Sequence, residues 1–148
     1  MDFGLLLGNA YQAFVRELHA HLAERGFPVM GSSYGFVLRT LDREATTATQ
    51  LGERLGITAQ GAAKVVDEMV AVGYVERRPD PTDKRAKRLH LAPGGVAMLT
   101  AVREFHAAYE GRLTQQVGAE DVAAVRRVLA AMVATSAGPD LARLFRPL

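Results

Sequence analysis

The chain of 148 residues contains no cysteine. Disulfide bonds, thiolate-based redox sensing and cysteine-ligated zinc are therefore excluded. The first residues, MDFGLLLGNAYQAF, lack the basic segment that begins a signal peptide, and no apolar run approaches the roughly 18–20 residues of a membrane span. From these absences we expect a soluble, cytoplasmic protein that makes no membrane contact.

Signatures of catalysis and of metal binding are also missing. The sequence has no His-x-x-x-His pair, no glycine-rich phosphate loop and no nucleophile motif. The candidate groups that do occur have two-residue spacings, which place their side chains on different sides of a helix: His19, His21, Glu104 and His106. We therefore predict a protein that is not an enzyme and that needs no cofactor and no metal.

Apolar residues recur along most of the chain at spacings of three and four, which is typical of amphipathic helices. Thr47 and Gln50 have the spacing of a capping box, Gly56 is suited to end a helix, and Thr58 is suited to cap the next one. The pattern predicts helices over 3–25, 30–42, Thr47 to Gly56, Thr58 to Gly73, 93–117 and 119–135. The tail, 136–148, is only weakly helical in pattern.

Two segments in the middle of the chain alternate like paired strands, "YVERR" and "RLHLA". They follow two short helices joined by a turn that contains glycine, and this order predicts a winged helix-turn-helix. We therefore expect a mainly α fold with a small β-hairpin wing. Residues 30–92 would form the DNA-binding lobe, and 1–29 with 93–148 an intertwined helical dimerisation region, because their apolar faces need a partner, most simply a second copy.

The helix from Thr58 has features of a helix that reads DNA. Gln60 and Lys64 share one face with Gly61 beside them, whereas Asp67 and Glu68 follow in the C-terminal half, where they would repel phosphate. The N-terminal half must therefore enter the groove, where glutamine can pair with adenine and lysine can reach guanine or phosphate. The alternative is an ordinary solvated helix face.

The segment from Tyr74 to Ala92 carries six bases and three acids, a net charge of +3. Asp83 lies two residues before Arg85, close enough to hold its guanidinium in one orientation, and an oriented arginine at a hairpin tip can enter a narrow minor groove. Pro79 and Pro81 stiffen the loop. The alternatives are a charged hairpin and a chance run of bases that resembles a nuclear-localisation signal. Both are disfavoured because the segment directly follows the helix-turn-helix.

Residues 49–95 resemble the MarR family (multiple antibiotic resistance regulators) in the phrases "VDEMVAVG" and "VERRPDPTDKR". The resemblance implies a homodimeric winged-helix transcription factor, usually a repressor, whose terminal helices form the dimer interface. Many members respond to small, often aromatic or anionic, ligands. It also implies that Arg85 is the wing-tip arginine, that Asp83 is its partner, and that Gln60, Gly61 and Lys64 face the major groove.

The residue pattern and the family resemblance together predict a set of DNA-binding residues and the form of the operator. A dimer places two recognition helices about 34 Å apart, so the double-stranded operator should be a pseudo-palindrome of roughly 16–20 base pairs. The predicted DNA-binding residues are Thr49, Thr58, Gln60, Gly61, Lys64, Asp83, Lys84, Arg85, Lys87 and Arg88. The recognition helix departs from the family at Gln60, Gly61 and Ala63, where hydroxyl residues are frequent. Ala92 stands where a threonine often caps the next helix, a cap worth about 1 kcal/mol.

In the family, a ligand pocket lies between the helical dimer part and the DNA-binding lobe. The aromatic residues that could line it here are Tyr11, Phe14, Tyr34, Phe36, Phe105 and Tyr109. Each of them could equally be a plain core or dimer contact. One further alternative remains for the whole chain, a winged-helix module that binds protein without sequence-specific DNA binding.

Overall fold

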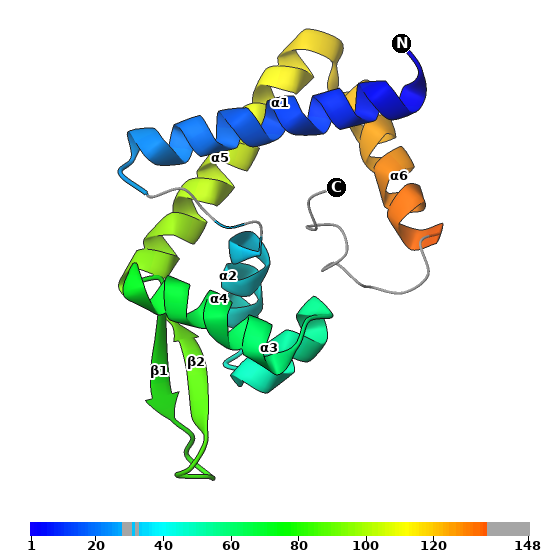
Figure 1. Ribbon diagram of the computed structural model, residues 1–148. Coiled ribbons are helices and arrows are strands. Elements are labelled where there is room, and N and C mark those ends of the chain that lie inside the picture. Colours follow the sequence, from blue (N-terminus) through cyan, green and yellow to red (C-terminus); the bar gives the residue numbers. More distant parts are fainter. Residues whose placement is uncertain (28–30, 32, 136–148) are drawn as a thin grey trace.

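The computed structural model describes residues 1–27, 31 and 33–135. In this part of the chain the order is α1 (Phe3–Glu24), α2 (Tyr34–Arg43), α3 (Ala48–Leu55), α4 (Ala59–Ala71), β1 (Val75–Pro79), β2 (Lys87–Leu91), α5 (Pro93–Val117) and α6 (Ala119–Thr135). Helices α2 to α4 and the β1–β2 hairpin form one lobe, and α5 leads from this lobe to α1 and α6 (Figure 1). The predicted fold class is confirmed.

The predicted helix over 30–42 is wrong at its beginning. Helix α2 starts at Tyr34, because the Tyr34 N–H donates to the carbonyl of Gly31 at 3.1 Å in a turn that precedes the helix. Glycine costs roughly 1 kcal/mol relative to alanine inside a helix, which favours a later start. The predicted weakly helical tail, 136–148, lies outside the described residues.

The two central helices begin and end where the sequence predicts. The Thr47 hydroxyl accepts from the Gln50 N–H at 3.2 Å, and the Gln50 side chain accepts from the Thr47 N–H at 3.1 Å, which completes the capping box. Gly56 ends α3 in the left-handed region at φ 62°, where glycine is favoured over residues with a Cβ. The Thr58 hydroxyl then caps α4 by accepting from the Gly61 N–H at 3.0 Å.

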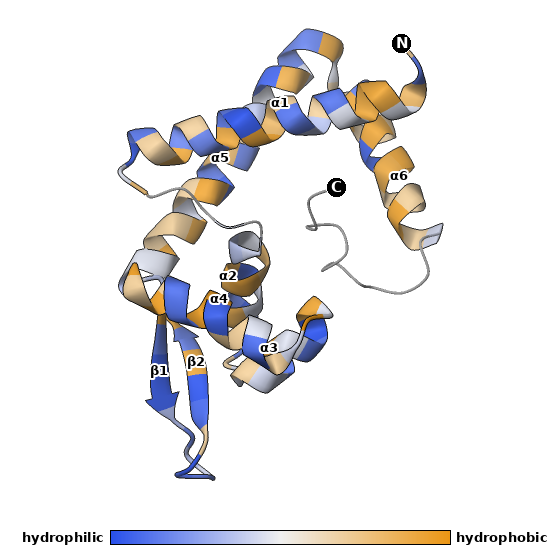
Figure 2. Ribbon diagram, in the orientation of Figure 1, coloured by the Kyte–Doolittle hydropathy of each residue, from blue (hydrophilic) through white to orange (hydrophobic). Residues whose placement is uncertain are grey.

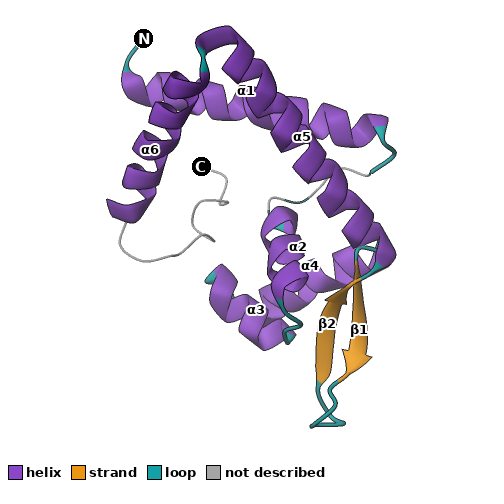
Figure 3. Cartoon of the chain, turned by 180° about the vertical axis from the view of Figure 1, so that it is seen from behind, coloured by secondary structure: helices purple, strands orange, loops and turns teal. Residues whose placement is uncertain are grey.

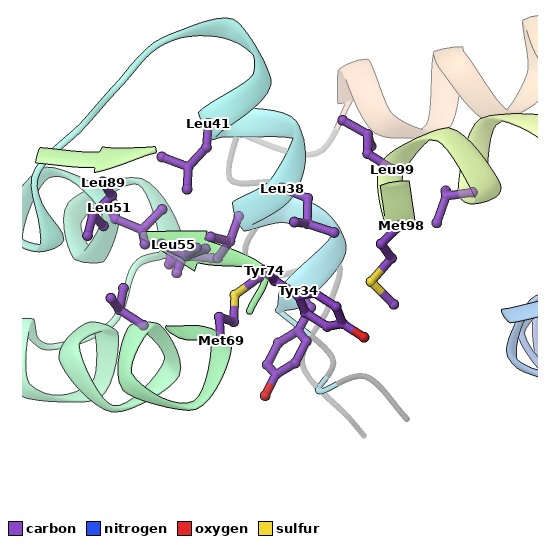
Figure 4. Close-up of a cluster of buried hydrophobic side chains, with 14 of the residues drawn as sticks. Tyr34, Leu38, Leu41, Leu51, Leu55, Met69, Tyr74, Leu89, Met98 and Leu99 are labelled. Carbon is purple, nitrogen blue, oxygen red and sulfur yellow. The ribbon is translucent and has the colours of Figure 1, made fainter. Parts of the chain in front are cut away.

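The hydrophobic core lies inside the lobe and extends along the first half of α5 (Figure 4). Its fully buried side chains come from α2, α3, α4, the hairpin and α5: Val37, Leu38, Leu51, Val66, Met69, Val75, Leu89 and Met98. Burying one such side chain contributes about 1.5–3 kcal/mol. Because every element of the lobe supplies at least one of them, the helix-turn-helix and the hairpin are parts of one folding unit.

The start of α5 lies directly on the backbone of the loop before β1. A Cβ added at Gly95 would lie 2.1 Å from the Tyr74 carbonyl oxygen, and one at Gly94 would lie 2.5 Å from the Gly73 carbonyl oxygen. The Ala92 N–H donates to the Tyr74 carbonyl at 3.0 Å. Ala92 is the N-cap of α5 without a side-chain cap, as its residue type predicts. Backbone packing at this joint therefore sets the direction in which α5 leaves the lobe.

Helix α6 and the start of α1 carry apolar side chains that the described chain leaves uncovered. Helix α6 has no buried residue, and Val125 and Phe3 are 57% and 62% exposed. Hydrophobic residues recur along α6 and α1 (Figure 2), and α6 descends from the end of α5 apart from the lobe (Figure 3). Among the described residues, no helix is long and apolar enough to cross a membrane.

Gly95→Ala tests the joint between α5 and the lobe. The new methyl group has no room beside the Tyr74 carbonyl, so we expect a loss of about 1–3 kcal/mol in the free energy of unfolding, the usual range for overpacking. Gly111→Ala in the same helix is the matched control, because its added Cβ meets no atom within 4 Å. Urea denaturation should show Gly111→Ala at least as stable as the wild type. Equal stability of the two variants would contradict the close contact.

Candidate nucleic-acid interface

Helix α4 buries one face and leaves its N-terminal half free on the other. Ala62, Val66 and Met69 are fully buried against the core, as their spacing predicts. Gln60 and Lys64 are exposed on the opposite face, and Gly61 is half-buried beside the Thr58 cap. The two longest predicted base-reading side chains are therefore accessible on a helix whose orientation is fixed by the core.

Helix α3 supports α4 through a close contact between small residues. A Cβ added at Gly52 would lie 3.2 Å from the Ala62 Cβ and 3.3 Å from the Ile57 carbonyl oxygen. Thr49, on the exposed side of α3, is accessible to solvent. The helix-turn-helix is therefore tightly packed, and Thr49 and the capped start of α4 lie at its surface.

The acids in the second half of α4 are held by neighbouring elements. The Asp67 carboxylate accepts from the Arg77 guanidinium of β1 at 2.5 Å, and the Tyr34 hydroxyl of α2 donates to Glu68 at 3.3 Å. The repulsion that the sequence suggests between Asp67 and phosphate is thus reduced by a neighbouring positive charge. This link between the wing and the recognition helix was not predicted from the sequence, because the two residues are ten positions apart.

The wing is an antiparallel hairpin that projects beyond α4, at the end of the lobe opposite α1 (Figure 1). Val75 pairs with Leu91 at its base and Pro79 with Lys87 near its tip. The Leu89 N–H donates to the Thr46 carbonyl at 2.7 Å, which attaches the hairpin to the segment before α3. The base of the wing is therefore part of the core, whereas its tip is exposed.

Asp80 organises the turn at the tip, a role that was not predicted from the sequence. Its side chain is only 7% exposed. Its carboxylate accepts from the Arg88 guanidinium at 2.5 Å, from the Thr82 hydroxyl and N–H at 2.7 and 2.8 Å, and from the Asp83 N–H at 3.2 Å. These donors, Arg88 first, hold the pKa of Asp80 well below its usual range. An aspartate before Pro-Thr-Asp is a recognisable turn signal.

The expected pairing of the Asp83 carboxylate with the Arg85 guanidinium is corrected by the structure. The Asp83 carboxylate accepts from the backbone N–H of Arg85 at 2.9 Å instead. A short aspartate side chain reaches a main-chain amide two residues on more readily than the end of a long side chain. Asp83 therefore shapes the turn from which Arg85 extends, and the guanidinium makes no ion pair with any residue in the described ranges.

The predicted wing bases differ in their surroundings. Lys84 and Lys87 are exposed like Arg85. Arg88 is bound to Asp80, and it also donates to the Ala45 carbonyl at 3.5 Å. Lys84, Arg85 and Lys87 are therefore presented to solvent, whereas Arg88 has partners within the lobe.

The structure brings together only some of the predicted pocket aromatics. Phe14 of α1 meets Phe105 and Tyr109 of α5 edge-on, with ring centroids 5.4 and 5.1 Å apart. Tyr34 lies in the lobe core beside Tyr74 instead. Phe36 packs against the same core, and Tyr11 is half exposed. The aromatic cluster at the α1–α5 crossing thus consists of Phe14, Phe105 and Tyr109, with His106 against Phe14.

Comparison with known proteins agrees with this geometry. The sequence profile of the MarR family matches residues 30–86. An uncharacterised protein of Mycobacterium tuberculosis is 30% identical over 97 residues, which cover 66% of this chain and 68% of that protein. The chain belongs to the MarR family. The matched segment contains the helix-turn-helix and most of the wing.

The chain is also similar to a transcriptional regulator and to a transcriptional repressor of known structure. The HTH-type transcriptional regulator PetP of Rhodobacter capsulatus is 28% identical over 125 residues, 84% of this chain and 74% of PetP. The transcriptional repressor CouR, bound to a 23-mer DNA duplex, has a similar structure, with a TM-score of 0.69 at 24% identity over 89% of this chain and 92% of CouR. MarR-family members are transcriptional regulators and not enzymes, and this chain has their winged-helix fold.

Acid should weaken the turn around Asp80. Because the pKa of Asp80 is lowered in the folded state, its charge adds stability that is present at neutral pH and is lost as the pH falls below about 4. We expect Asp80→Asn to unfold at lower urea than the wild type at neutral pH, with the difference shrinking as the pH falls. Glu120→Gln, at an exposed site, is the control. A difference that does not change with pH would contradict the role of the charge.

Proposed function

We propose that this chain is a homodimeric, sequence-specific DNA-binding transcriptional regulator, and that it acts as a repressor released by a small-molecule ligand. The observation that carries the proposal is the exposed, charged surface formed by the start of α4 and the tip of the wing. Gln60 and Lys64 lie at the first, and Lys84, Arg85 and Lys87 at the second. Both belong to one rigidly packed lobe, so they approach a duplex together.

The residues divide by the part of DNA that their chemistry suits. Gln60 and Lys64 would read base edges in the major groove, with Gly61 allowing close approach. Thr49, the backbone amides at Thr58 and the wing lysines would hold phosphates, and Arg85 would enter the adjacent minor groove. Asp83 would act by holding the turn that carries Arg85. The operator would be a pseudo-palindrome of about 16–20 base pairs, since two such lobes reach successive major grooves.

Uncovered apolar surface supports the homodimer. Contiguous exposed apolar faces of this kind mark interaction sites in soluble proteins. In the part of the chain that the structure describes, they lie on α1, at the end of α5 and on α6, and their members are Phe3, Leu5, Leu6, Leu113, Val117, Val125, Val128, Leu129 and Val133. A second copy would bury the same faces on both chains, as twofold symmetry requires. Residues 1–29 and 93–148 would thus serve dimerisation, and 30–92 would serve DNA binding.

The aromatic cluster at the α1–α5 crossing supports an effector site. Phe14 and Tyr109 are half-buried and pack on the buried ring of Phe105, and Arg39 of α2 comes within 3.5 Å of the His106 ring beside them. An aromatic or anionic ligand at this place would contact both the dimer helices and the lobe. It would release DNA by favouring a spacing of the two recognition helices that does not match the operator.

Two substitutions test the DNA interface. Arg85→Ala should weaken binding to many sequences alike, because it removes a contact to the DNA backbone or groove, whereas Gln60→Ala should relax preference at one base step by about 1–3 kcal/mol. Binding is measured by fluorescence anisotropy on an operator that the protein selects from a random duplex library, and on its single-base variants. Unchanged affinity in both variants would exclude this interface.

Absence of any duplex selected by the wild type would instead favour a winged-helix module that binds protein. A gel shift with genomic fragments, including the chain's own promoter, gives an independent reading of the same question. If competitor DNA of unrelated sequence abolishes binding as well as the unlabelled bound fragment does, the binding is not sequence-specific.

Leu129→Lys tests the proposed dimer. Leu129 is 41% exposed on α6, and a lysine there would place a charge inside an apolar interface, where its desolvation opposes association. We expect sedimentation equilibrium to show the wild type as a dimer and the variant with a much weaker self-association. Circular dichroism controls for the integrity of the helices. An unchanged association constant would remove α6 from the interface.

A further inference from the structure

The six bases of the segment from Tyr74 to Ala92, which the sequence presents as one positive cluster, have two kinds of surroundings in the folded chain. Three of them are ion-paired with carboxylates: Arg77 with Asp67, Arg78 with Glu76, and Arg88 with Asp80. The charged groups of Lys84, Arg85 and Lys87 form no ion pair with any residue that the structure describes. Half of the positive charge is thus already balanced before any nucleic acid is present.

Two of the three paired arginines connect the wing to another part of the lobe. Arg77 lies on β1, and its partner Asp67 lies on α4, so this pair joins the wing directly to the recognition helix. Arg88 lies on β2, and it binds both Asp80 in the tip turn and the Ala45 carbonyl before α3. The Arg78–Glu76 pair, in contrast, stays within β1. One arginine on each strand therefore connects the wing to another part of the lobe, Arg77 to α4 through an ion pair and Arg88 to the segment that leads into α3 through a hydrogen bond.

We propose that Arg77 and Arg88 are positioning residues, which hold the wing at a set angle to α4, and that Lys84, Arg85 and Lys87 supply the wing's phosphate and groove contacts. This inference rests on the proposed DNA-binding function and assigns the wing bases within it. Arg88, which sequence reasoning places among the contact residues, moves to the positioning group.

Charge balance supports this division. If Arg77 turned to a phosphate, Asp67 would be left as an unpaired carboxylate on the recognition helix, facing a polyanion. If Arg88 turned away, Asp80 would lose its strongest donor, and the turn that presents Arg85 would lose its organising contact. A single guanidinium would gain one phosphate contact and expose one repelling carboxylate. For Lys84, Arg85 and Lys87 there is no such opposing loss.

The salt dependence of binding separates the two groups, because each neutralised phosphate releases counterions. Removing one phosphate contact should lower the slope of log affinity against log salt concentration by about 0.9. We expect the slope to decrease in Lys84→Ala, Arg85→Ala and Lys87→Ala. The size of the decrease should be about 0.9 multiplied by the number of phosphate contacts that the bound protein loses. Arg77→Ala and Arg88→Ala should weaken binding to the selected operator while leaving the slope at the wild-type value.

The measurement uses fluorescence anisotropy with the full chain, at salt concentrations from about 50 to 200 mM. The probes are the selected operator duplex and a duplex of scrambled sequence. Thermal melts followed by circular dichroism check that each variant is folded. Arg77→Ala keeps the test available even if Arg88→Ala fails to fold, because the Arg77–Asp67 pair lies at the surface, with side chains 36% and 69% exposed.

A charge exchange provides the matched control. The double variant Asp67→Arg with Arg77→Asp keeps the net charge and the pair, so it should recover operator affinity relative to Arg77→Ala. Asp83→Arg with Arg85→Asp also keeps the net charge but removes the guanidinium from its place at the tip, so it should stay weak.

Each outcome is decisive for one of the two proposals. If the wild type binds neither duplex in a salt-dependent way, the proposed function itself fails. If the wild type binds but Arg77→Ala and Arg88→Ala flatten the salt slope as much as Arg85→Ala does, the division of the wing bases is wrong. Failure of the Asp67–Arg77 exchange to recover affinity would likewise overturn the positioning role of Arg77.

Discussion

The backbone contact between the first turn of α5 and the Gly73–Tyr74 segment is the constraint on which the rest of the molecule depends. Two glycines allow the helix to start against carbonyl oxygens, at distances that a Cβ at either position would not permit. Tyr74 is also the residue that leads into β1, and its carbonyl accepts from Ala92 at the end of the hairpin. A single small area therefore sets both the base of the wing and the direction of the long helix that reaches α1 and α6.

Electrostatics act on top of this packed frame and serve a different purpose. Exposed ion pairs such as Arg77–Asp67 contribute only about 0–1 kcal/mol to stability, far less than the core side chains around Leu38 and Met69. Their value here is directional, since they restrain the orientation of an exposed hairpin with few apolar side chains beyond its base. Core packing makes the lobe stable, and charge pairs orient the part of it that extends into solvent.

Local signals in the sequence were sufficient for most of the fold. The capping box at Thr47, the left-handed Gly56 and the cap at Thr58 each act within four residues, so the helix-turn-helix could be predicted from spacing alone. The start of α2 could not, because the apolar pattern that begins at Tyr34 does not show where the preceding turn ends. The Gly95–Tyr74 contact could not be predicted either. Glycine after proline is ordinary at the start of a helix, so its presence there does not indicate a close contact with a distant segment.

Prediction from the sequence was less complete for the candidate DNA interface than for the fold. The sequence identifies which side chains are basic but not which of them are already paired, because Arg77–Asp67 and Arg88–Asp80 join residues eight to ten positions apart. Asp83 was predicted to hold the Arg85 guanidinium, but its carboxylate accepts from the main-chain N–H of Arg85 instead. Counting charges along a loop therefore overstates the charge that the folded loop has available for a partner.

The contacts between the lobe and α5 differ in strength along this helix, and this difference bears on how the lobe could move. At the start of α5 the contact is backbone packing around Gly95, which resists displacement. Further along, Leu38 of α2 shares the buried core with Met98 and Leu99 of α5. Outside that core the two helices are joined by the exposed Arg103–Asp42 ion pair and by the Arg39–His106 contact, which are weak by comparison. A change at the aromatic cluster beside His106 would therefore meet little resistance from these exposed contacts, but tilting α2 relative to α5 would also have to shift the core that the two helices share, with the joint at Gly95 as the fixed end. Because the hairpin and α4 share the core with α2, such a tilt would carry the whole DNA-facing surface with it.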